Sequence, residues 1–326
     1  MIRVEGLFRS YGALKAVDGV SFEVPRGEVV GLLGHNAAGK TTIMKMITGY
    51  LEPSAGRIEV DGLDPARDRA AVQRRIGYLP ENCPVYPDMT VVGYLEYQAG
   101  LHGLTGAERD KAVAAAVRRT ALAEKALDPV HTLSRGYRQR VGVAQAILHD
   151  PDIVILDEPT NGLDPNQIRQ MRGLIRELAE HATVIVSTHI LQEVQAVCDR
   201  VLIIQDGRLA VDARLDELAG ICPGTDGMPA RQEAARRCGQ LRLEADAAPE
   251  TLRPLLEGLE GVTAVEPLES GEGHYRYRVE VADGERAPAV ARAVTEAGHA
   301  LFALAPQARD LETVFREVTE TEVAHA

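Results

Sequence analysis

The alternation of apolar and polar residues predicts two kinds of β-strand in the first two thirds of the chain. Residues 2–8 and 20–24 alternate with a period of two, as expected for antiparallel strands with one face on a core. Residues 29–33, 152–156 and 183–187 are nearly continuous apolar runs, which are typical of parallel strands covered on both faces. Because amphipathic stretches lie between these runs, the pattern predicts an α/β fold with a doubly wound, mixed sheet.

Helical periodicity and capping residues predict that the middle of the chain is mostly helical. Thr90 and Ser134 are good N-cap residues, and Thr105 with Glu108 matches a capping box. The further elements predicted before residue 181 are strands at 57–62 and 75–79 and helices at 90–98, 105–122, 134–149 and 165–180. We therefore expect a helical subdomain, at about residues 82–150, inserted between two halves of the α/β core.

The last third of the chain predicts a separate, small α+β domain. Residues 220–230 contain three glycines and two prolines, and we assign residues 220–237 as a linker. The pattern after it predicts strands at 240–245, 262–268, 274–281 and 300–305 and helices at 249–258, 286–297 and 310–320. This βαββαβ order is that of a ferredoxin-like unit. The predicted domains are therefore residues 1–219 and 238–326.

Charge, hydropathy and cysteine usage restrict the setting in which the chain works. The net charge is −12, and residues 1–220 hold 25 basic and 29 acidic side chains against 11 and 19 in the remainder. Such an acidic tail argues against bare nucleic acid as a partner. The sequence has no signal-peptide core and no apolar run near the roughly 18 residues of a membrane span. Four scattered cysteines favour a reduced, cytoplasmic setting, and the histidine spacing suggests no zinc site.

A glycine-rich loop follows the apolar run at residues 29–33 and precedes an amphipathic run. This loop matches G-x-x-x-x-G-K-[ST], and the strand–loop–helix context is the one in which the motif binds phosphate. Backbone N–H groups of the turn and the helix N-terminus attract the phosphates of a nucleotide. Lys40 would reach the β- and γ-phosphates, and Thr41 would bind Mg²⁺. The predicted nucleotide-binding residues of the loop are Gly34, His35, Asn36, Ala37, Ala38, Gly39, Lys40, Thr41 and Thr42.

Two carboxylates and a histidine stand at the ends of the predicted parallel strands. Asp157 and Glu158 follow the run at 152–156, and His189 follows the run at 183–187. Adjacent strand residues point to opposite faces, so Asp157 is suited to hold Mg²⁺ while Glu158 orients or deprotonates a water. His189 is suited to donate a hydrogen bond to a γ-phosphate. This set predicts phosphoryl transfer to water.

These motifs, in this order, resemble those of the ATP-binding cassette (ABC) ATPases over residues 1–217. The resemblance implies that Tyr11 stacks on adenine, that Val17 lies beneath the sugar and that Glu81 contacts Mg²⁺. It further implies that Ser134, Gly136 and Asp164 act across a dimer, in which Ser134 and Gly136 contact the γ-phosphate bound by the other subunit. ATP and Mg²⁺ are the implied cofactors, and Glu158, His189 and Lys40 are the implied catalytic residues.

The same resemblance implies partners and a location. One phosphate loop and one signature per chain imply that two copies, or this chain and a paralogous cassette subunit, sandwich two ATP molecules. The motifs are similar to those of single-cassette bacterial exporters, which implies an integral-membrane permease at the inner face of the cell membrane, contacted by residues 82–89. The alternative is a soluble ABC ATPase that acts on a macromolecular assembly. A phosphate-loop kinase or GTPase would not explain Ser134–Gly136, and no N-K-x-D guanine motif is present.

The chain departs from the family pattern at a few positions. Ala37 stands where the family commonly has glycine, so this position is either right-handed or mildly strained. His35 replaces the usual proline, and Arg135 and Tyr137 replace the first glycine and the glutamine of the signature. Because the positions of Ser134 and Gly136 are retained, we expect hydrolysis to be retained as well.

Overall fold

The computed structural model describes residues 1–216, 239–268, 274–282, 286–307, 311–312 and 315. The chain divides into two compact units, Met1–Arg214 and Leu215–Ala326. The predicted linker at 220–237 lies outside the described residues, and so does the predicted helix at 310–320 except for residues 311, 312 and 315. Within the described residues, no helix is both long and apolar enough to cross a membrane.

The first unit is built on a six-stranded sheet with the order β5-β6-β7-β3-β8-β9. Neighbouring strands are parallel from β5 to β8, and β9 pairs antiparallel with β8. The strands are β3 Val29–Leu33, β5 Ile76–Leu79, β6 Ile153–Asp157, β7 Thr183–Thr188, β8 Arg200–Gln205 and β9 Arg208–Arg214. Every residue of β3, β6 and β7 is buried, as their continuous apolar runs predict. The predicted α/β fold with a mixed sheet is confirmed.

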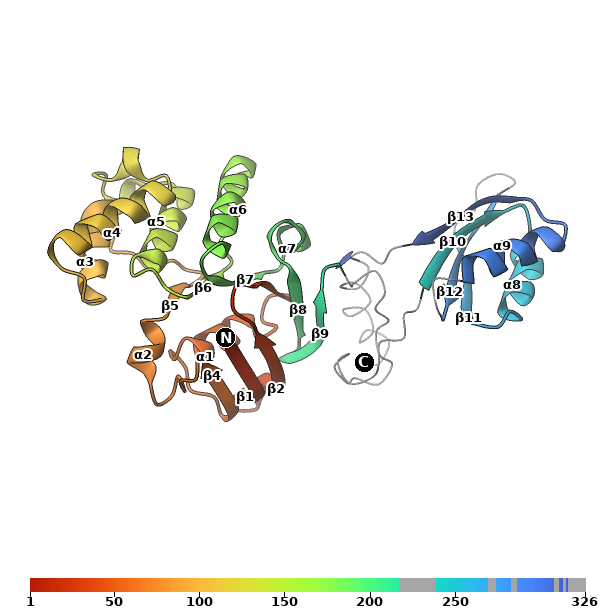
Figure 1. Cartoon of the computed structure of the whole chain (residues 1–326), viewed down its shortest axis with the longest axis horizontal. Coiled ribbons are helices and arrows are strands. Elements are labelled where there is room, and N and C mark those ends of the chain that lie inside the picture. Colours follow the sequence, from red (N-terminus) through yellow and green to blue (C-terminus); the bar gives the residue numbers. More distant parts are fainter. Residues whose placement is uncertain (217–238, 269–273, 283–285, 308–310, 313–314, 316–326) are drawn as a thin grey trace. The chain divides into compact units, whose positions relative to one another are not determined.

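An antiparallel three-stranded sheet with the order β2-β1-β4 packs in the same unit (Figure 1). Its strands are β1 Ile2–Tyr11, β2 Leu14–Val24 and β4 Ala55–Val60. One shared core includes Val4 and Val24 of this sheet, Ile43 and Met44 of helix α1 (Lys40–Ile47), and Ile155 of β6. The phosphate-loop helix therefore lies between the two sheets.

Helices α3 Val91–Leu101, α4 Gly106–Arg119 and α5 Arg135–Ile147 form a helical group inserted between β5 and β6 (Figure 1). Thr90 caps α3 by accepting a hydrogen bond from Gly93 N. The predicted capping box at Thr105 and Glu108 is wrong, because the Thr105 side chain makes no cap hydrogen bond. Gly106, the first residue of α4, has φ +54, so the helix start is irregular and the threonine does not reach its third residue.

The remaining helices of the first unit are α2 Arg69–Gln73, α6 Pro165–Ala179 and α7 Leu191–Val197, and single 3₁₀ turns occupy Ala123–Lys125 and Val130–Thr132. Asp164 caps α6, and Pro165 occupies its first turn. Helices α2 and α7 and strands β8 and β9 are absent from the sequence prediction. Tyr11, predicted in a turn, is instead the last residue of β1 and pairs with Leu14.

The second unit has the antiparallel strand order β11-β12-β10-β13. Its elements are β10 Gly239–Ala245, α8 Pro249–Glu257, β11 Val262–Pro267, β12 Tyr275–Val281, α9 Ala287–Glu296 and β13 Leu301–Gln307. Leu252 and Leu256 of α8 and Val290 and Val294 of α9 pack on Leu243 and other strand residues in a core of their own. This connectivity confirms the predicted ferredoxin-like order.

Candidate functional site

The glycines at the two ends of the phosphate loop are required by close backbone approaches. A Cβ at Gly34 would lie 2.3 Å from the Ile204 carbonyl oxygen, which is closer than real contacts allow. A Cβ at Gly39 would lie 2.5 Å from the Ala16 carbonyl oxygen, and Gly39 has φ +107. The loop therefore fits tightly between β8 and β2, and only glycine permits this turn at its ends.

Lys40 places a positive charge inside this loop. Its Nζ donates hydrogen bonds to the carbonyl oxygens of Gly34 at 2.7 Å and His35 at 3.0 Å. The same nitrogen lies 3.8 Å from Glu158 Oε1, and the side chain is only 6% exposed. Burial lowers the pKa of Lys40, whereas the nearby charges of Glu158, Asp157 and Glu81 raise it. The structure thus brings Lys40 together with the two predicted carboxylates.

Ala37, at the exposed tip of the loop, adopts the left-handed region with φ +67. Of the two alternatives for Ala37, right-handed or mildly strained, the strained one is therefore correct. This conformation costs a non-glycine residue roughly 1–2 kcal/mol. His35 and Asn36 are exposed beside it, and Ala38 is buried with its N–H bonded to the His35 carbonyl.

Replacing Ala37 with glycine is expected to stabilise the protein. Glycine relieves the left-handed strain but adds entropy to the unfolded chain, so Ala37→Gly should raise the free energy of unfolding by about 0.5–1 kcal/mol. Urea denaturation of the parent and variant measures this change. Ala38→Gly is the matched control, because Ala38 is 7% exposed and has no positive φ. The control should be destabilised, and an equal loss in both variants would contradict the strain at Ala37.

Asp157 lies at the end of β6 and is fully buried. Burial raises its pKa, and the hydroxyls of Thr41 and Ser187 oppose that shift. Within the described residues, neither carboxylate oxygen of Asp157 has a hydrogen-bond partner of normal geometry, and neither does Ser187 Oγ. Unsatisfied buried oxygens beside a threonine hydroxyl are a donor set that fits a hard divalent cation such as Mg²⁺.

Glu158 and His189 meet at the ends of adjacent parallel strands. His189 Nδ1 lies 3.0 Å and 2.9 Å from the two carboxylate oxygens of Glu158. Burial raises the pKa of Glu158, and the hydrogen bond from His189 opposes the shift. The His189 side chain is 40% exposed and the Glu158 side chain 7%, so solvent reaches the imidazole but hardly the carboxylate. A buried carboxylate of raised pKa beside an accessible imidazole is suited to general-base chemistry.

A bridge that sequence reasoning missed connects the chain segments at the ends of the same two strands. Thr160 and Thr188 donate hydroxyl hydrogen bonds to the two carboxylate oxygens of Glu193 on α7. Glu193 is 3% exposed. The apolar residues Leu191 and Val194 around it were the available signal for a helix, but α7 has only seven residues and no side-chain cap at Ile190.

The starts of α5 and α6 pack against each other through two glycines. Ser134 caps α5, accepting a hydrogen bond from Tyr137 N at 3.4 Å. A Cβ on Gly136 would lie 2.4 Å from Gln167 Oε1 of α6. A Cβ on Gly162 would lie 2.6 Å from Nη1 of Arg135. Each glycine therefore makes room for a long side chain of the other segment.

Asp164 completes this second cluster. Its carboxylate accepts hydrogen bonds from Asn166 N and Gln167 N at 2.9 Å, and the Gln167 side chain accepts one from Asp164 N in return. Ser134, Gly136 and Asp164 are thus gathered at two adjacent helix N-termini. These three residues belong to the starts of α5 and α6, whereas Lys40, Asp157, Glu158 and His189 belong to the phosphate loop and the strand ends.

The other predicted site residues differ in their exposure and in their contacts. Tyr11 is 48% exposed, and the Arg9 guanidinium carbon lies 4.8 Å above its ring centre. Val17 is fully buried. A Cβ on Gly39 would lie 3.6 Å from its Cγ2, so Val17 packs against the end of the loop. Glu81 is exposed directly after β5, and its charge raises the pKa of both Lys40 and Asp157. Thr41 and Thr42 are half-buried at the start of α1.

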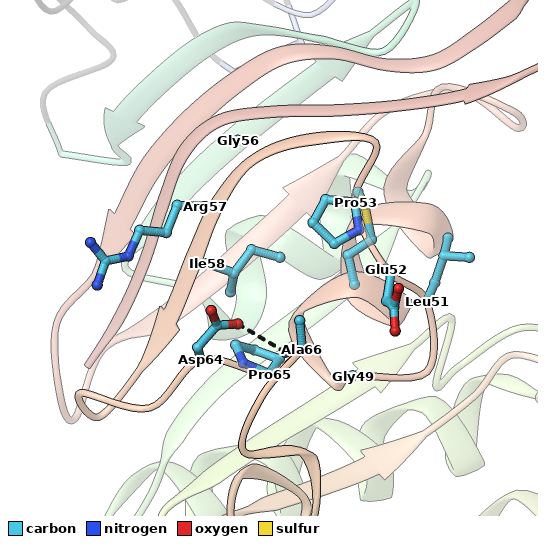
Figure 2. Close-up of a pocket in the computed structure, with 11 residues that line it drawn as sticks. Gly49, Leu51, Glu52, Pro53, Gly56, Arg57, Ile58, Asp64, Pro65 and Ala66 are labelled. Atoms are coloured by element: carbon cyan, nitrogen blue, oxygen red, sulfur yellow. Dashed lines mark hydrogen bonds between the residues drawn. The ribbon is translucent and has the colours of Figure 1, made fainter.

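A cavity elsewhere in the first unit shares no residue with this site (Figure 2). It lies beyond the C-terminal end of α1, where Met46, Gly49 and Ile58 form part of its wall, and Glu52, Arg57 and Asp64 stand around it. Its volume of about 100 Å³ is well below the roughly 300 Å³ at which ligand pockets begin. It does not compete with the phosphate loop as a nucleotide site.

The strand–loop–helix with its buried lysine and the two strand-end carboxylates define a phosphate-loop nucleotide-binding protein. The family model described as "ABC transporter" matches residues 17–161. The uncharacterized ABC transporter ATP-binding protein YdbJ of Bacillus subtilis (strain 168) is 39% identical over 217 residues, which are 66% of this chain and 70% of that protein. The bacitracin transport ATP-binding protein BcrA of Bacillus licheniformis is 36% identical over 220 residues, 67% of this chain and 71% of BcrA.

A solved structure agrees with these relatives. A bacterial ABC transporter cassette solved as a dimer is 25% identical, with a TM-score of 0.61, over 66% of this chain and 99% of that chain. The chain belongs to the ATP-binding proteins of the ABC transporter family, and it is an ATPase. The predicted family, fold class and enzyme class are therefore confirmed.

Proposed function

We propose that the chain is the ATP-hydrolysing subunit that energises a separate membrane permease, for export, through a dimer that sandwiches two ATP molecules. The observation that carries the dimer is that the predicted site residues fall into two clusters on different elements of one chain. Lys40 and Glu158 gather at the phosphate loop, whereas Ser134, Gly136 and Asp164 gather at the starts of α5 and α6. A second copy, or a paralogous cassette subunit, brings the second cluster to the first one. The dimeric cassette that resembles this chain supports this arrangement.

The proposed site divides the work of hydrolysis among named residues. The backbone N–H groups of Gly34–Thr42 and the Lys40 ammonium hold the phosphates. Thr41 and Asp157, with Glu81 nearby, would hold Mg²⁺, which when bound neutralises phosphate charge. Glu158 orients the attacking water, and His189 contacts the γ-phosphate. Tyr11 stacks on adenine, and Val17 lies beneath the sugar.

The proposed partner is an integral-membrane permease, and the proposed location is the inner face of the cell membrane. BcrA is named a bacitracin transport protein, which supports transport as the coupled process. The contact is assigned to residues 82–89, which follow β5 and reach the helical group. In this segment Tyr86 is 53% exposed, and its ring packs edge-on against Tyr94 and Tyr97. An exposed aromatic side chain that is held in place by neighbouring rings is typical of an interface anchor.

Truncating that anchor should weaken the complex with the permease. Tyr86→Ala and Met89→Ala together are expected to reduce co-purification of the permease and transport by at least about tenfold, as for a hot-spot pair. ATP affinity should not change, because the phosphate loop is untouched. Leu127→Ala is the matched control, since Leu127 is 78% exposed elsewhere in the helical group. Intact co-purification and transport in the double variant would place the contact elsewhere.

Two measurements test the dimer: the dependence of specific activity on protein concentration, and the activity of Ser134→Ala. The specific activity of the parent should rise with protein concentration, because each site needs a second chain. Ser134→Ala is expected to lower kcat about 100-fold, the usual loss for one donor to a charged transition state.

The control for this experiment removes a helix cap without touching the second cluster. Thr90→Ala deletes a comparable cap hydrogen bond at α3, so it matches the stability cost of about 1 kcal/mol. Full activity of the parent at high dilution, or a Ser134→Ala variant no worse than Thr90→Ala, would contradict the proposed dimer.

A further inference from the structure

Glu193 is a buried carboxylate outside the sequence-predicted site, and both its oxygens are used. The side chain is 3% exposed on the short helix α7. Thr160 donates to Oε1, and Thr188 donates to Oε2 at 2.9 Å. Buried carboxylates are rare and costly unless their oxygens are satisfied. The carboxylate of Glu193 therefore has a specific task at this point in the fold.

The two threonines belong to the two chain segments that carry the predicted water-activating pair. Thr160 follows Glu158 by two residues, and Thr188 directly precedes His189. These segments leave β6 and β7, which are parallel and pair Asp157 with Ser187. Glu193 thus joins the same two segments that the Glu158–His189 hydrogen bond joins.

The backbone around the bridge leaves little freedom on either side. Glu158 N donates to the Ser187 carbonyl at 3.0 Å, and Ile190 N donates to Thr188 Oγ1 at 3.0 Å. His189 lies between two residues held in this way, so the direction of its ring depends on the position of Thr188. A shift of about 1 Å at a reacting group is enough to lower a rate about 100-fold.

We propose that Glu193 is a positioning residue that sets the gap between the two segments, so that His189 Nδ1 meets the Glu158 carboxylate. It acts through Thr160 and Thr188 and touches neither nucleotide nor water. Its effect on ATP hydrolysis rests on the proposed function, whereas its effect on the His189 ring does not.

The bridge depends on shape and hydrogen bonding. A glutamine can accept from the Thr188 hydroxyl through its oxygen and donate to Thr160 Oγ1 through its amide, because a hydroxyl both donates and accepts. Glu193→Gln is therefore expected to keep the bridge, and Glu193→Ala to remove it. The matched control is Gln195→Ala, an exposed position on the same helix.

The closing experiment measures the ring and the rate separately. The ¹⁵N signals of the His189 imidazole, assigned by their loss in His189→Asn, report whether Nδ1 is hydrogen-bonded. In Glu193→Ala they should move to the values of a solvent-exposed imidazole, and in Glu193→Gln and Gln195→Ala they should match the parent. In the same proteins, kcat for ATP should fall on the order of 100-fold in Glu193→Ala. KM should change far less than kcat, because Lys40 keeps its contacts even where His189 loses the γ-phosphate.

Two outcomes would overturn the proposal. His189 signals in Glu193→Ala that match the parent would show that the bridge does not position the ring. A Glu193→Gln variant as impaired as Glu193→Ala would assign the effect to charge instead. A parent chain that hydrolyses no ATP would contradict the proposed function alone, since the His189 signals test Glu193 without turnover.

Discussion

Glu158→Gln is expected to bind ATP with near-parental affinity while its turnover falls about 10³-fold or more. The amide keeps the size of the side chain but cannot take a proton from water, and general-base catalysis contributes about 10²–10⁴-fold. Because ATP persists in the sites, closed dimers should accumulate. Phosphate release and gel filtration with ATP measure the two effects. The control is Glu180→Gln, which removes one exposed carboxylate just after α6 and should leave both unchanged. Undiminished steady-state hydrolysis would mean that another group handles the water.

The same substitution has a stability effect whose sign follows from the pKa of Glu158. Burial raises that pKa in the folded state, so ionisation of Glu158 opposes folding. Above the folded pKa the parent carries this cost in full, and Glu158→Gln should unfold at higher urea concentration than the parent. Below the pKa of an unfolded glutamate both side chains are neutral, and the difference should vanish. Urea midpoints measured across this pH range test the prediction.

Lys40→Ala should weaken ATP binding about 100-fold, the loss expected for hydrogen bonds from one ammonium to charged oxygens. The variant also leaves the charges of Glu158 and Asp157 without the cation that lies 3.8 Å from Glu158. Calorimetric titration with ATP measures the affinity. Lys45→Ala is the matched control, because Lys45 is exposed on the same helix. A binding isotherm equal to that of the parent would contradict the phosphate-loop assignment.

Local signals explain which parts of this fold were predictable. The phosphate loop, the buried strands and the Ser134 cap each depend on residues close together in the sequence, and all are present. The ferredoxin-like order of the second unit follows from strands and helices of ordinary length. The roles of the individual site residues stay predictions, even though Lys40, Asp157, Glu158 and His189 lie together.

The features that the sequence did not predict correctly depend on contacts between distant residues or on backbone conformation. Helix α7 is short and is held by tertiary bonds, among them the bond from Thr188 to Glu193, so no local cap announces it. The positive φ of Gly106 prevents the capping box that Thr105 and Glu108 predict. Ala37 shows the same limit, because residue type alone left its backbone region open and the loop decides it.

The close approach at Gly136 ties the integrity of one helix to a residue in another. The Gln167 side chain belongs to the capping box of α6, because it accepts a hydrogen bond from Asp164 N. It fills the space that any side chain at position 136 would occupy. A substitution there would push Gln167 off its cap and fray the start of α6. Lost activity in a Gly136 variant therefore combines damage to the start of α6 with any lost phosphate contact. Testing the variant in a background that already lacks the Gln167 side chain separates the two effects.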